Sequence, residues 1–269
     1  MRKKILAVTL LLTGLLVSCG GGSGSVSSEA INSGQFYDSP VANVEYSTSS
    51  GLSGKTDDNG TFKYRNGDTI TFKIGDVVLG TTEARKIITP IDLVSNNTEN
   101  VLIISAFLLA LDEDDDPSNG IQVKSDNLSI GEEVDLSNCT IDELPDEIET
   151  MVNATLDEAN KHLSESMFDL LNVTLQELDG KKITFQGPNM LGSCYFELND
   201  INSTERTITA KFTSCEGDME DDNVTFSVEN GIPYLYEGDG KKDIVLSIDY
   251  QGFCLYTDDI GKICVKQEE

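Results

Sequence analysis

The sequence contains no tryptophan, a single histidine, and only 19 Lys and Arg residues against 47 Asp and Glu residues. The resulting formal net charge of −28 excludes a general nucleic-acid-binding protein, because such proteins need a basic face. The same charge repels anionic lipid head groups and excludes a polybasic contact with a membrane. Aromatic residues make up only 7% of the chain, which argues against a lectin surface that stacks sugars.

The motifs of common catalytic sites are also missing. The lone histidine, His162, would have to serve in any Ser-His-Asp or Cys-His pair, but its place in a helical pattern predicts a partly exposed helix residue. No Gly-x-Ser-x-Gly elbow and no His-Glu-x-x-His metal pair is present, and no Gly-rich phosphate loop follows a strand pattern. We therefore expect a protein that is not an enzyme. An acid-pair hydrolase stays open as the alternative, since carboxylates occur along the whole chain.

Basic residues, a short apolar stretch and a cysteine follow one another at the N-terminus. Residues 2–4 are Arg-Lys-Lys, residues 5–17 are largely apolar, and Leu16-Val17-Ser18-Cys19 resembles the lipobox of bacterial lipoproteins. The apolar stretch is shorter than the roughly 20 residues that span a bilayer. We expect residues 1–18 to be a signal peptide and Cys19 to carry a lipid. With such a signal and lipid, the mature protein is expected at the bacterial outer membrane, facing the periplasm or the cell surface.

The remaining cysteines suit an exported protein. No CxxC pair exists, so zinc-ribbon and thioredoxin-type sites have no support, whereas export makes disulfides possible. Antiparallel pairing of neighbouring predicted strands would bring two pairs of cysteines together. We predict the disulfides Cys194–Cys215 and Cys254–Cys264, with Cys139 left free.

Alternation of apolar and polar residues predicts strands in two separate regions. Between Phe36 and Leu79, period-two runs separated by Asn-Gly turns predict a small antiparallel sheet with one buried face. Between Lys181 and Val265, eight short runs predict a meander that closes into a barrel or forms a curled sheet. The predicted fold class is mainly β with helices (α+β): an N-terminal antiparallel β-sandwich module, a helical connector and a C-terminal barrel-like domain.

Two helices are predicted between these regions. Val101–Leu111 is apolar on nearly every face and too short to cross a bilayer, so it is expected to be a buried helix packed on the sheet. Thr140–Leu178 repeats apolar residues at helical spacing, with Pro145 at the start of the main helix. It is either one long helix or two with a break near Ser164. The preceding Ile87–Leu93 is expected to be extended.

These patterns divide the chain into five segments. After the signal peptide, residues 19–34 are rich in Gly and Ser and form a lipidated flexible linker. Residues 35–121 are the β-module with its buried helix and an acidic loop, and residues 122–180 are the helical connector. Residues 181–269 are the C-terminal antiparallel β domain.

Part of the first β region carries a family pattern. Gly54-x-Thr56-Asp57-x-x-Gly60-x-Phe62-x-Tyr64 resembles the pattern of carboxypeptidase-regulatory-like, prealbumin-like sandwich modules, which are usually non-catalytic. The longer run from Asp38 to Ile121 resembles a module of uncharacterised surface lipoproteins of Gram-negative bacteria. That module pairs such a β region with a Thr-Pro, apolar helix, Leu-Asp, Asp-Pro, Asn-Gly-Ile segment, whose last part stands here at residues 119–121. The resemblance implies a surface lipoprotein without an established activity, and Ser39 departs from the acidic residue or Ala of the pattern.

An acidic cluster after the buried helix is the one candidate metal site. Asp112, Asp114, Asp116 and Ser118 recur at every second position, as the oxygen ligands of an EF-hand-like loop do. Pro117 stands where such a loop needs Gly, so a full EF-hand is excluded. Calcium would offset the unfavourable charge of carboxylates at a helix C-terminus. A solvated acidic turn is the alternative.

The combined patterns predict a lipid-anchored, exported, non-catalytic protein that acts in binding, adhesion or envelope assembly. Its partners would be the membrane, through the lipid, and an envelope protein, a glycan or a small molecule; calcium is the one cofactor predicted. A further alternative is a carrier of a small apolar ligand in the C-terminal β domain. An inward-facing row of Phe, Tyr and Ile around an empty lumen would favour that carrier.

Overall fold

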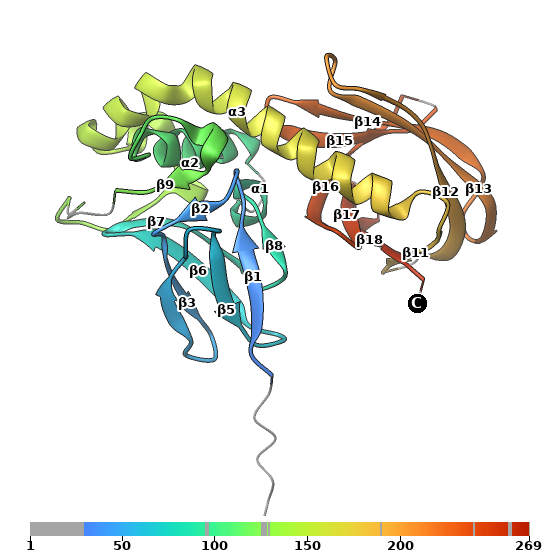
Figure 1. The fold of residues 1–269 in the computed structure, drawn as a ribbon, viewed down its shortest axis with the longest axis horizontal. Helices are drawn as coiled ribbons and strands as arrows, with labels where there is room; N and C mark the ends of the chain where they lie inside the picture. The colour runs from blue at the N-terminus through green and yellow to red at the C-terminus, as the bar shows by residue number, and fades with distance from the viewer. Residues whose placement is uncertain are drawn as a thin grey trace, which may run out of the picture.

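The structure is a computed structural model that describes residues 30–94, 97–124, 128, 130–188, 190–238, 240–257 and 260–268. The predicted signal peptide, the lipidation site Cys19 and most of the predicted linker lie outside these residues. The predicted fold class is confirmed: the chain is mainly β with helices, and its strands form an N-terminal group of sheets and a C-terminal barrel (Figure 1).

The N-terminal group contains two sheets whose apolar faces meet. In one sheet the strand order is β5 (Thr61–Tyr64), β1 (Asn32–Phe36), β8 (Ile87–Ile88). In the other it is β10 (Val134–Asp135), β7 (Val77–Glu83), β6 (Thr69–Ile74), β3 (Glu45–Thr48), β4 (Ser53–Lys55). Phe36 of the first sheet stacks on Phe72 of the second at 4.6 Å between ring centroids. Each sheet has one short edge strand that pairs in parallel with its neighbour, β8 with β1 and β10 with β7. The other strands of the two sheets pair antiparallel.

Three α-helices and a further pair of short strands complete the part of the chain before the barrel. They are α1 (Pro90–Leu93), α2 (Thr98–Ala110), β2 (Val41–Ala42) paired with β9 (Ile121–Gln122), and α3 (Asp146–Leu178). Three 3-10 turns lie between them: η1 (Pro117–Asn119), η2 (Leu136–Asn138) and η3 (Ile141–Glu143). Helix α2 is buried and shares a core with the sheets, as predicted. None of the helices among the described residues is apolar over a length that would cross a membrane.

The prediction of an extended Ile87–Leu93 is wrong in its second half. Only Ile87–Ile88 forms a strand, and a helical turn begins at Pro90. Proline suits the first position of a helix because its φ is already helical and its missing N–H is not needed there. Asp92 completes the turn by accepting hydrogen bonds from the backbone N–H and the hydroxyl of Thr89.

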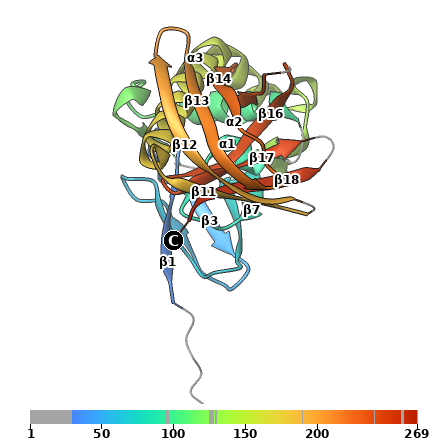
Figure 2. The ribbon, with the colours of Figure 1, turned by 90° about the vertical axis from the view of Figure 1, so that its right-hand side faces the viewer.

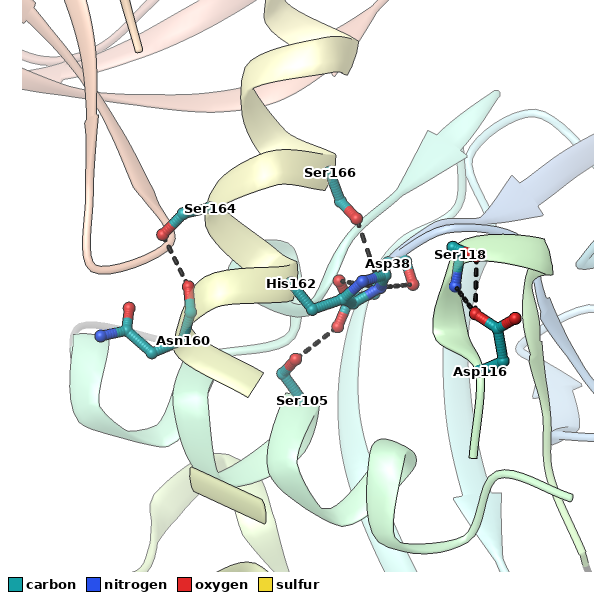
Figure 3. A network of polar contacts seen from close by, with 8 residues as sticks. All are labelled: Asp38, Ser105, Asp116, Ser118, Asn160, His162, Ser164 and Ser166. Carbon is teal, nitrogen blue, oxygen red and sulfur yellow. Dashed lines mark hydrogen bonds and ion pairs between the residues drawn. The ribbon is translucent and has the colours of Figure 1, made fainter. Parts of the chain in front are cut away.

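Helix α3 is one continuous helix of 33 residues, which decides between the two predicted alternatives. Ser164 does not break it, because the hydroxyl donates to the carbonyl of Asn160 within the helix (Figure 3). The first half packs on the N-terminal core through Ile148, Val152 and Ala159. The second half packs into the barrel core with a separate row of apolar side chains: Leu163, Met167, Phe168, Leu170, Leu171, Leu175 and Leu178. One helix therefore supports both parts (Figure 1).

The C-terminal strands form a closed antiparallel barrel, so the predicted meander closes (Figure 2). The first strand pairs with the last, Phe185 lying opposite Val265. The strands in order are β11 (Lys182–Gly187), β12 (Met190–Asn202), β13 (Thr207–Gly217), β14 (Asp222–Glu229), β15 (Ile232–Tyr236), β16 (Lys242–Asp249), β17 (Gly252–Thr257) and β18 (Gly261–Gln267).

Both predicted disulfides are confirmed, and Cys139 is a free thiol. Cys254 lies directly opposite Cys264 in the pairing of β17 with β18. The bond between Cys194 and Cys215 spans an irregular stretch of the pairing of β12 with β13, between Ser193 and Tyr195. The local hairpin register was therefore sufficient to place both bonds.

Candidate functional site

The two ends of the barrel differ. At one end, the turns that join β12 to β13 and β14 to β15 meet helix α3: Arg206 pairs with Glu165 at 3.4 Å. Gly231 approaches Leu163 so closely that a Cβ on this glycine would stand 2.4 Å from the leucine Cδ2. Gly231 also has φ +77°, a conformation that glycine adopts without strain. Helix α3 therefore closes this end of the barrel.

The other end opens into a cavity of about 440 Å³. Its walls are apolar side chains from the inner faces of six strands: Phe185, Phe212, Val224, Leu235, Leu255 and Ile263. Further lining comes from Met190, Met219, Thr257 and Ile260. Of the Phe, Tyr and Ile expected to face the lumen of a carrier, Phe and Ile are present among the described lining residues and Tyr is not.

A chain of phenylalanine rings crosses the barrel below the cavity. Phe185 and Phe212, which line the cavity, meet edge to face with centroids 5.3 Å apart. Phe212 then contacts Phe196 at 5.7 Å, Phe196 contacts Phe226 at 6.4 Å, and Phe226 contacts Phe253 at 5.5 Å. All five rings are buried. These rings form the floor that separates the open cavity from the apolar side chains of α3.

The rim of the cavity is acidic. Six carboxylates line it: Asp218, Glu220, Asp221, Asp222, Glu237 and Asp243. Lys241 is the one basic side chain among the described lining residues. Asp221 is fixed to the barrel wall, since its Oδ1 accepts a 2.9 Å hydrogen bond from the backbone N–H of Cys215. Asp243 lies deeper than the rim turns, on the inner face of β16 opposite Leu235, and is only 5% exposed.

A second hollow lies outside the barrel, between the start of α2 and strands β15 to β17, with a volume of about 600 Å³. Its one basic lining residue, Lys242, is paired with Glu229 at 3.3 Å and stacked on Tyr234 at 4.1 Å from the ring centroid. These contacts satisfy Lys242 within the protein. The barrel interior combines enclosing walls with a distinct charge at its mouth, so we place the candidate site there.

The predicted calcium ligands lie far from this cavity, on the loop after α2. Asp114 accepts hydrogen bonds from the backbone N–H of Asp116 and the side-chain amide of Asn119. Asp116 accepts from the backbone N–H and the hydroxyl of Ser118 (Figure 3). Asp112 is buried, its Oδ1 accepts two backbone hydrogen bonds, and burial raises the pKa of its carboxyl. Among the described residues, no three His, Cys, Asp or Glu side chains gather as a metal site.

Calcium binding by this loop stays a prediction. If Asp114 and Asp116 hold calcium, Ca²⁺ in low salt is expected to stabilise the protein more than Mg²⁺ does. The gain would be about 1.4 to 2.7 kcal/mol at ten to a hundred times the dissociation constant. Thermal unfolding of wild type and of Asp114→Asn tests this expectation. Equal unfolding temperatures with either ion, or no change in either protein, would leave only a solvated turn.

His162 is not a partly exposed helix residue, as the sequence predicted, but is 9% exposed and faces the N-terminal sheets (Figure 3). Its Nε2 donates a 3.0 Å hydrogen bond to the carbonyl of Asp38, and lies 3.6 Å from Oδ1 of the same residue. Ser105 donates to Asp38 Oδ2 at 2.5 Å, and Ser166 lies 3.4 Å from the same Nε2. The network joins the β-module to the middle of α3.

This network contains serine, histidine and aspartate but not the geometry of a catalytic triad. In a triad, one imidazole nitrogen faces the serine and the other faces the carboxylate. Here Nε2 of His162 faces both Asp38 and Ser166. Burial raises the pKa of the Asp38 carboxyl above its usual range, partly offset by His162 and Ser105. The group is a buried connection between the two parts of the fold.

No protein-family model, curated protein or solved structure matches the chain. Sequence reasoning did not identify the mouth of the barrel, although the density of acids between Glu216 and Asp222 was visible as a turn. The contribution of Asp243 had no such signal, since this aspartate directly follows Lys241 and Lys242 at the start of a strand.

Proposed function

We propose that this protein is a non-catalytic binding protein, lipid-anchored through Cys19 in the bacterial outer membrane, whose barrel carries a small ligand with an apolar body. The observation that carries the proposal is the cavity of about 440 Å³ inside the barrel, open at one end. The floor of phenylalanine rings and helix α3 close the opposite end. Among the predicted roles, ligand binding is favoured over adhesion and envelope assembly because the cavity lies inside the barrel.

The size and chemistry of the cavity support such a role. Pockets for small molecules commonly measure about 300 to 1,000 Å³ and combine apolar walls with a few polar groups. Barrels of eight strands have interiors wide enough to hold one small ligand. Apolar walls made of Phe212, Val224 and Leu255 would gain free energy by excluding water from an apolar ligand.

An acid-pair hydrolase is the second candidate, since several carboxylates converge on the same mouth. The two proposals differ in what happens to the bound molecule. A carrier returns its ligand unchanged, whereas a hydrolase releases products. Mass spectrometry of a candidate glycoside after incubation with the protein distinguishes them.

A fluorescent probe tests the carrier directly. N-phenyl-1-naphthylamine, which is apolar and uncharged at neutral pH, is expected to show saturable binding to the wild-type protein. Val224→Phe places a larger side chain in the cavity wall and should weaken this binding about tenfold or more, which corresponds to about 1.4 kcal/mol. Circular dichroism establishes that the variant is folded.

The matched control is Val173→Phe, the same substitution on an exposed position of α3. It is expected to leave probe affinity unchanged. Absence of saturable binding to wild type, or equal affinity in Val224→Phe, would contradict a ligand site in the lumen.

A further inference from the structure

We propose that the ligand of the barrel is an organic cation: a protonated amine joined to an apolar chain or ring. This inference rests on the proposed function and specifies the chemistry of its ligand. It follows from the juxtaposition of an apolar lumen with an acidic mouth, two features that recognise different ends of one molecule. An uncharged apolar ligand would need only the first feature.

The charge of the mouth is one-sided. Six carboxylates line the cavity, and Lys241 is the only cationic side chain that the described lining includes. The carboxylates come from separate elements: the turn between β13 and β14, the start of β14, the end of β15 and the start of β16. Because they line one opening, their fields add within it. An anion would be repelled at the entrance, whereas a cation would be concentrated there.

Nearby lysines are engaged elsewhere. Lys182 contacts Glu216 and Glu268, each at 3.4 Å, and Lys242 contacts Glu229 at 3.3 Å. None of these described ion pairs involves a residue that lines the cavity. The acidic field of the mouth is therefore not neutralised by these two lysines.

Asp243 places a carboxyl group below the rim. It is 5% exposed and lies on the inner face of β16, opposite the cavity-lining Leu235. Charges in an apolar, water-poor surrounding interact more strongly than charges in water. A ligand whose ammonium group lay near Asp243 would place its apolar body against walls such as Phe212 and Leu255.

The test compares three probes that share an eight-carbon chain and differ only in head group: octylamine, octanol and octanoate. Each competes with N-phenyl-1-naphthylamine for the full-length protein at pH 7 in low salt. Octylamine is expected to displace the fluorescent probe at about a tenfold lower concentration than octanol, with octanoate the weakest. Added salt should reduce the advantage of the amine, because it screens the charges at the mouth.

Two variants assign the preference to the mouth. Asp243→Asn, and the combined Glu220→Gln, Asp222→Asn, are expected to lower affinity for octylamine severalfold while leaving octanol unchanged. The control Glu147→Gln, Glu158→Gln removes as many carboxylates as the double mouth variant, from exposed positions of α3, and should change neither affinity. If a mouth variant fails to fold, the salt dependence of the wild-type protein still decides.

The outcomes separate the two proposals. Preference for octylamine that salt and the mouth variants reduce supports the inference. Equal displacement by all three probes overturns it and leaves the lumen as a general apolar site. Displacement by none of them, together with no binding of the fluorescent probe, overturns the proposed function and this inference with it.

Discussion

Phe226→Ala is expected to lower the free energy of unfolding by about 3 to 5 kcal/mol, the usual cost of truncating a buried phenylalanine. Phe226 is fully buried, and its ring contacts Phe196 and Phe253 in the floor of the cavity. The neighbouring rings can only partly fill the space, because protein interiors are close-packed and relax incompletely. Chemical denaturation of both proteins measures the difference.

The same substitution should deepen the ligand cavity. Phe226 lies two residues beyond Val224 on β14, one inward position further from the mouth. With the floor opened, amines longer than octylamine should gain affinity in the variant by up to about fourfold for each additional buried methylene. Competition assays with amines of increasing length measure this gain.

Phe72→Ala provides the control, since Phe72 is also fully buried but lies in the N-terminal core. It should destabilise the protein by a similar amount and leave the chain-length preference unchanged. If Phe226→Ala loses little stability, or if both variants alter the chain-length preference equally, the ring does not form the floor.

Replacing Cys194 and Cys215 together by Ser is expected to cost about 3 kcal/mol of stability in the chain-entropy model for a bond with this sequence separation of 21 residues. A second effect should follow at the site. Cys215 also holds the acidic turn, because its backbone N–H donates to Asp221. Loss of the disulfide should therefore reduce the preference for octylamine as well as the unfolding temperature.

The other disulfide is the matched control. Replacing Cys254 and Cys264 by Ser should cost a similar amount, about 3 kcal/mol, because the entropy of loop closure depends only on the logarithm of loop length, although this sequence separation is 10 residues against 21. Neither cysteine lines the cavity, so the head-group preference should stay as in wild type. A loss of preference in both double variants would show that general loosening of the barrel is responsible.

Local patterns predicted much of the barrel. Alternation of Val224, Phe226 and Val228 with polar neighbours predicted strand β14 and its inner face. Turn residues then gave the hairpins, and hairpin register placed the disulfides. These features depend on residues close together in the chain, where side-chain period and turn chemistry act directly.

Local sequence patterns could not predict which strands pair when they lie far apart in the chain. The sequence left open whether the meander closes, because closure depends on β11 pairing with β18, about 80 residues away. The parallel pairing of β8 with β1 was missed for a similar reason, since two residues such as Ile87-Ile88 carry no register information. A short apolar pair fits either direction.

The buried polar groups were the least predictable. Asp38 and His162 meet across 124 positions of sequence, and a histidine beside Leu163 on an amphipathic helix is ordinarily read as a flanking residue. The helix buries this side because both parts of the fold pack on it. The carboxylates of the cavity mouth come from the hairpin ends between β13 and β16, and their convergence on one opening depends on how the sheet curls, which local patterns do not specify.

The most direct test of the central claim is to locate a bound molecule in the barrel. Methyl NMR spectra recorded during titration with octylamine should show shifts at the cavity-lining Leu235, Leu255 and Ile263. Methyl groups of Ile70 and Ile74 in the N-terminal core should stay in place. Saturable shifts confined to the lumen are the predicted result. Unchanged lumen methyls, or shifts only at outward-facing residues such as Ile201, would contradict the claim that the barrel carries a ligand.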